Sequence, residues 1–180
     1  MQRIVSRLAT FIAVLALSGC ASKPPQKIAL QNTFDGAEAT RLLSPGTSTI
    51  KGSALMRQVG GGVVTCAGQD VRLVPATSYA KERMINLYGS IDKGTRSAFL
   101  LQTNSEPFES THPNYVGLQR VTTCDAQGFF KFEGVASGEF FVMSTITWKA
   151  NPSSVFYEGG SMMRRVIVDT SEAKELVIAP

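Results

Sequence analysis

Residues 123–142 of the chain read TCDAQGFFKFEGVASGEFFV and carry the clearest signal of the expected fold. Asp125 and Gly128 mark a tight turn, because aspartate and glycine supply its unusual backbone dihedral angles. Phenylalanines then recur at alternate positions, which is the period of a strand with one buried face. Gly138 permits a second reversal before another strand begins. The stretch therefore predicts two consecutive strands that pack on a core through aromatic side chains.

Further strands are expected on both sides of this stretch, where short apolar runs lie between turn signals. With the two above, the expected strands cover residues 49–56, 69–75, 98–101, 115–121, 129–132, 139–149, 162–168 and 176–179. In the run 139–149, one face is shared by Phe140, Val142, Ser144, Ile146 and Trp148. About seven or eight strands separated by turns are typical of a β-sandwich rather than of an α/β sheet.

Two segments change from the strand period to the helix period. In residues 77–88, one helical stripe holds Tyr79, Ala80, Met84, Leu87 and Tyr88. Ser78 is the predicted N-cap of this helix, and Gly89 is its predicted stop. Residues 35–44 predict one or two helical turns that begin at Asp35. The sequence thus predicts one helix, residues 77–88, inserted into a mainly β fold, with a short helix before it.

The stretch 123–142 resembles the pattern T-x-D-x-x-G-x-F-x-F-x-x-V-x-x-G-x-Y-x-V of carboxypeptidase regulatory-like domains. The motifs Ile50-x-Gly52-x-Ala54 and Gly68-x-x-Val71-x-Leu73-x-Pro75 are similar to the first strands of that family. The resemblance implies a transthyretin-like (prealbumin-type) Greek-key sandwich of about seven strands over residues 47–180. The chain departs from the pattern at Phe140, where tyrosine is usual, and in the length of the predicted helix 77–88.

The first 19 residues have the layout of a secretory signal. Arg3 and Arg7 precede the apolar run Leu8–Leu17, which is shorter than the roughly 20 residues that span a bilayer core. The sequence Leu17-Ser18-Gly19-Cys20 resembles the bacterial lipobox and argues against an ordinary signal peptide or a buried helix. It implies cleavage before Cys20 and a lipid anchor on that residue, which attaches the protein to a membrane.

Lipidation of Cys20 would make residues 20–46 a tether that carries the short helix. Ala21 stands where an aspartate would favour the inner membrane, so a resemblance to enteric-type lipoproteins implies the outer membrane and a domain facing the periplasm. Cys66 and Cys124 then remain as an even pair in an exported chain, which predicts a disulfide. A reactive dithiol would more often show Cys-x-x-Cys spacing, and these two cysteines are 58 positions apart.

Charge and motifs argue against several classes of function. Removing Arg3 and Arg7 from the 18 basic residues leaves 16 against 14 acidic ones, a net charge of +2. These charges are scattered, whereas a nucleic-acid partner would need a basic stripe. His112 is the single histidine, too few for the zinc or iron sites of enzymes with related folds. No nucleophile elbow or phosphate loop occurs. We predict that the protein is not an enzyme and that it binds no metal or cofactor.

The expected function is that of a membrane-anchored binding or structural module, with an envelope protein or polysaccharide as partner. The candidate surfaces are the helix 77–88 with Tyr79 and the loop 151–160 with Phe156 and Tyr157. Phe130, Phe132, Phe140 and Trp148 are assigned to the core. The alternative is a carbohydrate-binding module with an exposed platform of Trp148, Tyr115 or Tyr157. A third alternative is an enzyme with an unrecognised site around His112.

Overall fold

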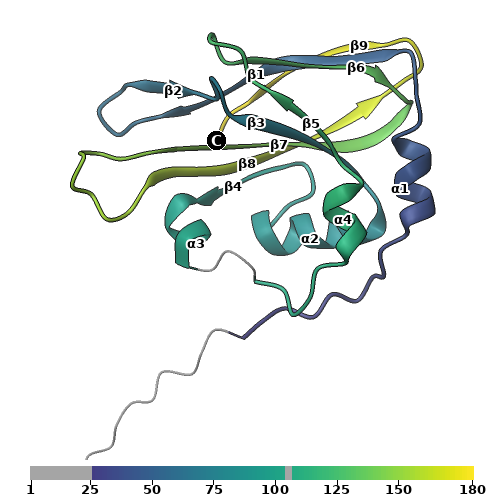
Figure 1. Ribbon diagram of the computed structural model, residues 1–180, viewed down its shortest axis with the longest axis horizontal. Coiled ribbons are helices and arrows are strands. Elements are labelled where there is room, and N and C mark those ends of the chain that lie inside the picture. The colour runs from purple at the N-terminus through teal and green to yellow at the C-terminus, as the bar shows by residue number, and fades with distance from the viewer. Residues whose placement is uncertain (1–25, 104–106) are drawn as a thin grey trace, which may run out of the picture.

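The computed structural model describes residues 26–103 and 107–180, which form two stacked β-sheets with helices on one side (Figure 1). In the first sheet, β1 (Ser48–Arg57) pairs antiparallel with β2 (Val63–Thr65) and β6 (Phe129–Val135), and parallel with β9 (Ala173–Ile178). The second sheet is antiparallel throughout. Its strand order is β4 (Lys93–Ser97), β8 (Glu158–Val168), β7 (Gly138–Trp148), β3 (Asp70–Pro75) and β5 (Arg120–Thr123). The mainly β sandwich is confirmed.

The described residues contain four helices, which are α1 (Gly36–Leu42), α2 (Ser78–Tyr88), α3 (Ala98–Thr103) and α4 (Pro113–Gly117). Helices α2, α3 and α4 lie on the side of the second sheet that faces away from the first sheet, and α1 stands at one end of the sandwich (Figure 1). We call α2, α3 and α4 the helix layer. The protein therefore has three layers, in the order sheet, sheet and helices.

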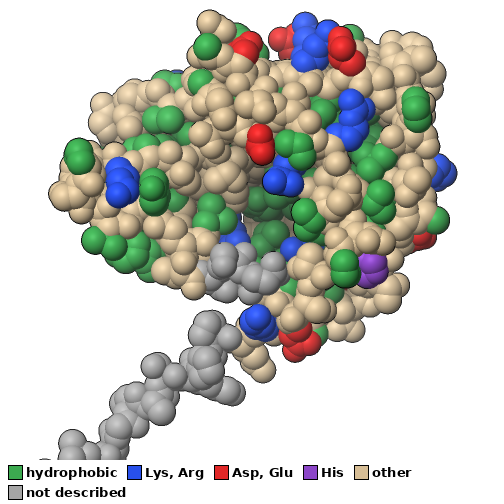
Figure 2. All heavy atoms as spheres, viewed as in Figure 1, with side chains coloured by type: hydrophobic (Ala, Val, Ile, Leu, Met, Phe, Trp, Pro, Cys, Tyr) green, Lys and Arg blue, Asp and Glu red, His purple; other side chains and the backbone are tan. Residues whose placement is uncertain are grey.

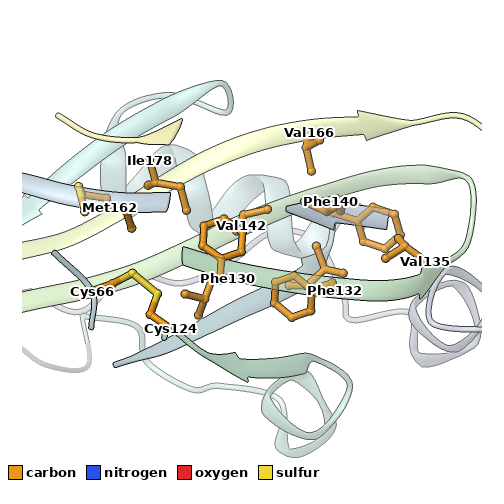
Figure 3. Packing of buried hydrophobic residues seen from close by; sticks show 14 of the residues in the cluster. Cys66, Cys124, Phe130, Phe132, Val135, Phe140, Val142, Met162, Val166 and Ile178 are labelled. Atoms are coloured by element: carbon orange, nitrogen blue, oxygen red, sulfur yellow. A yellow bond between two sulfur atoms is a disulfide. The ribbon is translucent and has the colours of Figure 1, made fainter. Parts of the chain in front are cut away.

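The long strand β7 separates two hydrophobic clusters. Phe140 and Val142 point between the sheets, where they join Phe130 and Phe132 in the larger cluster (Figure 3). Phe141 points the other way, into the cluster between the second sheet and the helix layer. The alternation follows from the period of two in a strand. The predicted core positions of Phe130, Phe132 and Phe140 are confirmed, and around Phe140 and Phe141 the second sheet is buried on both faces.

A disulfide joins the ends of the two sheets. Cys66 directly follows β2, Cys124 directly follows β5, and their sulfurs are bonded with the Cα atoms 5.7 Å apart. Both cysteines are buried at one end of the inter-sheet core (Figure 3). The predicted pairing is confirmed, and the bond holds together edges of the sandwich that no backbone ladder connects.

Several local predictions need correction. Residues 98–101 form helix α3 rather than a strand, because a short apolar run fits a helix or a strand equally well. Residues 115–121 were expected as one strand, but helix α4 ends at Gly117 and β5 begins only at Arg120. Pro113 favours the helix there, since its fixed φ suits the first helical turn. The strands β2 and β4 went unpredicted.

The helix caps were predicted in part. The Asp35 carboxylate accepts hydrogen bonds from Ala37 N (2.9 Å) and Glu38 N (3.0 Å), so the predicted N-cap of α1 is confirmed. For α2, the N-cap is Thr77 rather than Ser78, because the Thr77 hydroxyl accepts from Ala80 N at 3.3 Å. Gly89 ends α2 in the left-handed conformation, as predicted.

Residues 26–34, which we call the N-terminal strap, run along the helix layer. Ile28 N donates to Pro107 O at 2.8 Å, and Glu109 N donates to Ile28 O at 3.0 Å. Farther along, the Glu82 carboxylate of α2 accepts from the backbone nitrogens of Gln31 (2.7 Å) and Asn32 (2.8 Å). The structure thus places this part of the predicted tether on the folded domain. The predicted signal peptide and Cys20 lie outside the described residues.

The attachment of the strap is expected to weaken in acid. Hydrogen bonds from the Gln31 and Asn32 backbone hold the pKa of the Glu82 carboxyl below its usual value. A carboxyl whose pKa is lower in the folded state than in the unfolded state stabilises the folded state. This stabilisation is complete above the pKa of the unfolded state and is lost as the pH falls through the pKa of the folded state. Hydrogen exchange of the Gln31 and Asn32 amides, corrected for intrinsic rates, should therefore accelerate over that range.

Glu82→Gln should give the fast exchange already at neutral pH, because an amide binds these donors more weakly than a carboxylate does. Glu109→Gln is the control, since its backbone binds the strap while its side chain is not part of this contact. Equal protection of both amides in Glu82→Gln and in the unchanged protein at neutral pH would contradict the prediction.

Candidate functional site

Three aromatic side chains are exposed together at one end of the second sheet. Phe99 of α3 is 53% exposed, and Phe156 and Tyr157 of the β7–β8 loop are 54% and 44% exposed. Hydrophobic side chains gather over this loop and α3 in the surface view (Figure 2). We call Phe99, Gln102, Lys149, Phe156 and Tyr157 the tip surface. An exposed apolar patch of this kind is typical of a binding site.

Side-chain contacts fix the loop against α3 and orient the rings. Gln102 donates through Nε2 to Tyr157 O (3.5 Å) and accepts through Oε1 from Tyr157 N (3.4 Å), so one side chain meets both backbone polar groups. The Phe99 and Phe156 rings lie edge to face with centroids 5.5 Å apart. Lys149 Nζ lies 5.4 Å from the centre of the Tyr157 ring. The rings are thereby held in place while about half of each side chain stays exposed.

Trp148 lies beside the tip surface but is half-buried. Its indole Nε1 donates to Glu158 Oε2 at 3.1 Å, and its ring packs against the edge of the inter-sheet core. The indole also lies on the backbone of Gly159, where an added Cβ would come within 2.6 Å of it. Gly159 has φ +85°, which also favours glycine. Trp148 therefore packs on the backbone beside the tip surface and presents little of its own ring to a ligand.

Two residues predicted at a binding surface are buried. Tyr79 is 5% exposed, and Tyr115 of α4 is buried with it under the strap. The two rings lie 5.2 Å apart, and both contact the ring of Phe34 from the strap. Tyr79 therefore cannot belong to a partner surface, and Tyr115 cannot belong to a sugar platform. The reason is that the predicted stripe of α2 faces the second sheet and a helix layer that the sequence did not indicate.

A buried arginine holds the aromatic cluster of the helix layer together. The Arg83 guanidinium carbon lies 4.0 Å from the centre of the Phe108 ring and 4.8 Å from that of Tyr115. Its Nη1 donates to Thr111 Oγ1 at 2.9 Å. Burial raises the pKa of Tyr115 to about 12, so its hydroxyl stays protonated. These contacts are closed to a ligand and serve to pack the layer.

His112 has a structural position in the described part of the chain. Its Nδ1 accepts from Asn114 N at 3.3 Å and so caps helix α4, and its ring lies 5.0 Å from that of Phe34. Within residues 26–103 and 107–180, no three His, Cys, Asp or Glu residues gather as metal ligands would. In the same residues, no helix has the length and apolar character needed to cross a membrane.

Comparison with known proteins supports the fold. No family model matches the chain, and no curated protein sequence matches it. A solved structure from Pseudomonas aeruginosa, called a "putative carbohydrate binding protein", matches with a TM-score of 0.68 and 23% sequence identity. The match covers 83% of this chain and 99% of that one. At this identity the likeness establishes a shared fold. The resemblances to carboxypeptidase regulatory-like domains and to the lipobox stay predictions.

The sequence predicted only part of the tip surface. Phe156 and Tyr157 were named from their place in a polar loop, and the structure shows them exposed. Phe99 and Gln102 were missed, because residues 98–101 were taken as a strand. A helical interpretation of that run, which starts after Ser97, would have put Phe99 and Gln102 three positions apart and so on one side of a helix.

Proposed function

We propose that this protein is a carbohydrate-binding module of the bacterial cell envelope and that its tip surface holds the glycan. The exposed rings of Phe99, Phe156 and Tyr157 carry the proposal. A sugar ring has one face of C–H groups that packs on an aromatic ring, and hydroxyls at its edge that need hydrogen-bonding partners. The tip surface combines both needs, because the Lys149 ammonium and the Tyr157 hydroxyl stand beside the rings. The proposal involves no catalytic step.

The resemblance of Leu17-Ser18-Gly19-Cys20 to the lipobox supports a second part of the proposal, which is a lipid anchor on Cys20 at the outer membrane. Export to the periplasm also fits the disulfide between Cys66 and Cys124, since such bonds persist in oxidising compartments. Radiolabelled palmitate should label the unchanged protein in cells and should not label Cys20→Ser. Absence of label from the unchanged protein would contradict the anchor and leave the glycan site unaffected.

Tyr157→Ala is expected to weaken glycan binding about tenfold, which corresponds to a loss of about 1.4 kcal/mol of binding free energy. The change removes a ring on which a sugar would pack. The probes are immobilised peptidoglycan fragments and soluble oligomers of N-acetylglucosamine, glucose and mannuronate, and each probe that binds is followed by calorimetric titration. Tyr157→Phe keeps the ring and should retain most of the affinity.

Phe129→Ala is the matched control, because Phe129 is 57% exposed but lies on β6 in the other sheet. It should bind glycan as the unchanged protein does. The proposal fails if none of the probes binds, or if Tyr157→Ala and Phe129→Ala have equal effects. Capture of an envelope protein by the tip surface, with no affinity for any of the glycans, would favour the protein-binding alternative instead.

A further inference from the structure

A polar groove crosses the outer face of the second sheet and has no role in the site described above. Its volume is about 360 Å³, and its lining includes Gln69, Asp70 and Arg72 on one side and Met143 and Thr145 on the other. Asp70 and Arg72 point outward because the intervening Val71 points into the inter-sheet core. Arg72 is paired across the sheet with Met143, so the charged groups of β3 stand beside the thioether of β7.

The charged groups in this groove are available to a ligand. Among the described residues, the half-buried Arg72 side chain has no hydrogen bond or ion pair with another side chain or backbone group. The Asp70 carboxylate accepts one long hydrogen bond, from Thr123 Oγ1 at 3.4 Å, and forms no ion pair with Arg72. Elsewhere on the same sheet, by contrast, Arg165 forms an ion pair with Glu139 at 3.0 Å. The opposite charges of the groove are therefore held near each other without neutralising each other.

Adjacent hydroxyls of a sugar ring can use both charges at once. One hydroxyl donates to a carboxylate while the next accepts from a guanidinium, and both hydrogen bonds are strengthened by the charge. The Gln69 amide and the Thr145 hydroxyl can serve further polar groups, and the Met143 thioether supplies an apolar contact for C–H groups. Asp70 and Arg72 contribute no net charge, which suits an uncharged sugar better than an acidic one.

We infer that this groove is a second subsite for an uncharged glycan chain whose other end occupies the tip surface. The inference rests on the proposed function. Thr145 lies on β7, and Lys149 of the tip surface directly follows that strand, four residues away, or about 13 Å at about 3.3 Å per residue. A chain of a few sugars spans this separation. Occupying both subsites with one chain makes the second contact intramolecular, so affinity should rise with chain length.

The test compares the dimer and the hexamer of N-acetylglucosamine by calorimetric titration of the full chain. The unchanged protein should bind the hexamer at least tenfold more tightly than the dimer. Arg72→Ala should weaken hexamer binding about tenfold, which is the effect expected when a charged hydrogen bond is lost. It should leave dimer binding at the tip surface unchanged. Asp70→Asn, which preserves shape, should act in the same direction. Circular dichroism verifies that both variants are folded.

Arg57→Ala is the matched control, because Arg57 is an exposed arginine at the end of β1 in the other sheet. It should bind both oligomers as the unchanged protein does. Equal affinity of the unchanged protein for dimer and hexamer, or an undiminished hexamer affinity in Arg72→Ala, would overturn the groove subsite while leaving the tip surface in place. Failure of both oligomers and of every other probe to bind the unchanged protein would overturn the proposed function itself and the subsite with it.

Discussion

Replacing both bridged cysteines, Cys66→Ser together with Cys124→Ser, is expected to lower the free energy of unfolding by about 4 kcal/mol in the chain-entropy model. The bond closes a loop with a sequence separation of 58 residues, so its loss frees a long segment of the unfolded chain. In the described residues it is also the only covalent cross-link between side chains of the two sheets. Urea denaturation followed by fluorescence measures the difference, because the half-buried Trp148 lies at the edge of the core.

Reduction of the unchanged protein is the control for this prediction. It should reproduce the loss of stability without any change of side chain, and mass spectrometry should show a gain of two hydrogens. The double variant should then be insensitive to reductant. A loss of less than about 1 kcal/mol, the size of a typical single substitution, would mean that the bond adds little to the packing of the sheets.

Phe141→Ala is expected to lower the free energy of unfolding by about 3–5 kcal/mol, the range for a phenylalanine removed from a packed interior. Phe141 has no exposed surface and packs with Val74, Met84 and Met163 between the second sheet and the helix layer. Its loss would leave a cavity under α2, and hydrogen exchange of α2 should increase with it. Denaturant titration and exchange mass spectrometry measure the two effects.

Phe129→Ala serves as the control here as well, since the same change at an exposed site should cost less than about 1 kcal/mol. A similar cost at Phe141 and Phe129 would show that the helix layer does not pack on the sheet as described. The comparison therefore tests the layer that distinguishes this protein from a two-layer sandwich.

The stretch 123–142 predicted its own structure well because its signals are local. The Asp125 carboxylate accepts from Gln127 N and Phe129 N, both at 2.9 Å, and Gly128 has φ +86°. Both features depend on residues within the turn, and β6 follows at once with alternate aromatic side chains buried. Such local determinants can be identified without knowledge of the rest of the fold.

The helix layer could not be predicted in the same way. A partner surface was assigned to Tyr79 because the helix 77–88 is longer than a loop of a simple sandwich. A buried site for its ring exists only once Phe34 and Tyr115 come together from distant segments. The groove at Arg72 is likewise formed by β3 and β7, which are about 70 residues apart in the chain. Contacts of this kind depend on sheet order, which no local pattern of residues specifies.

Under the proposed lipid anchor on Cys20, the N-terminal strap would set the distance of the domain from the membrane. Ile28 is the first residue of the described chain with a hydrogen bond to the domain, and it lies eight residues after Cys20. Fully extended, these eight steps reach at most about 29 Å. A protein lipidated at Cys20 would therefore be held within that distance of the membrane, with its helix layer close to the lipid headgroups. It could meet only glycans that come within reach of that surface. The connecting chain would lengthen only if Ile28 were released from Pro107 and Glu109 and the strap from Glu82.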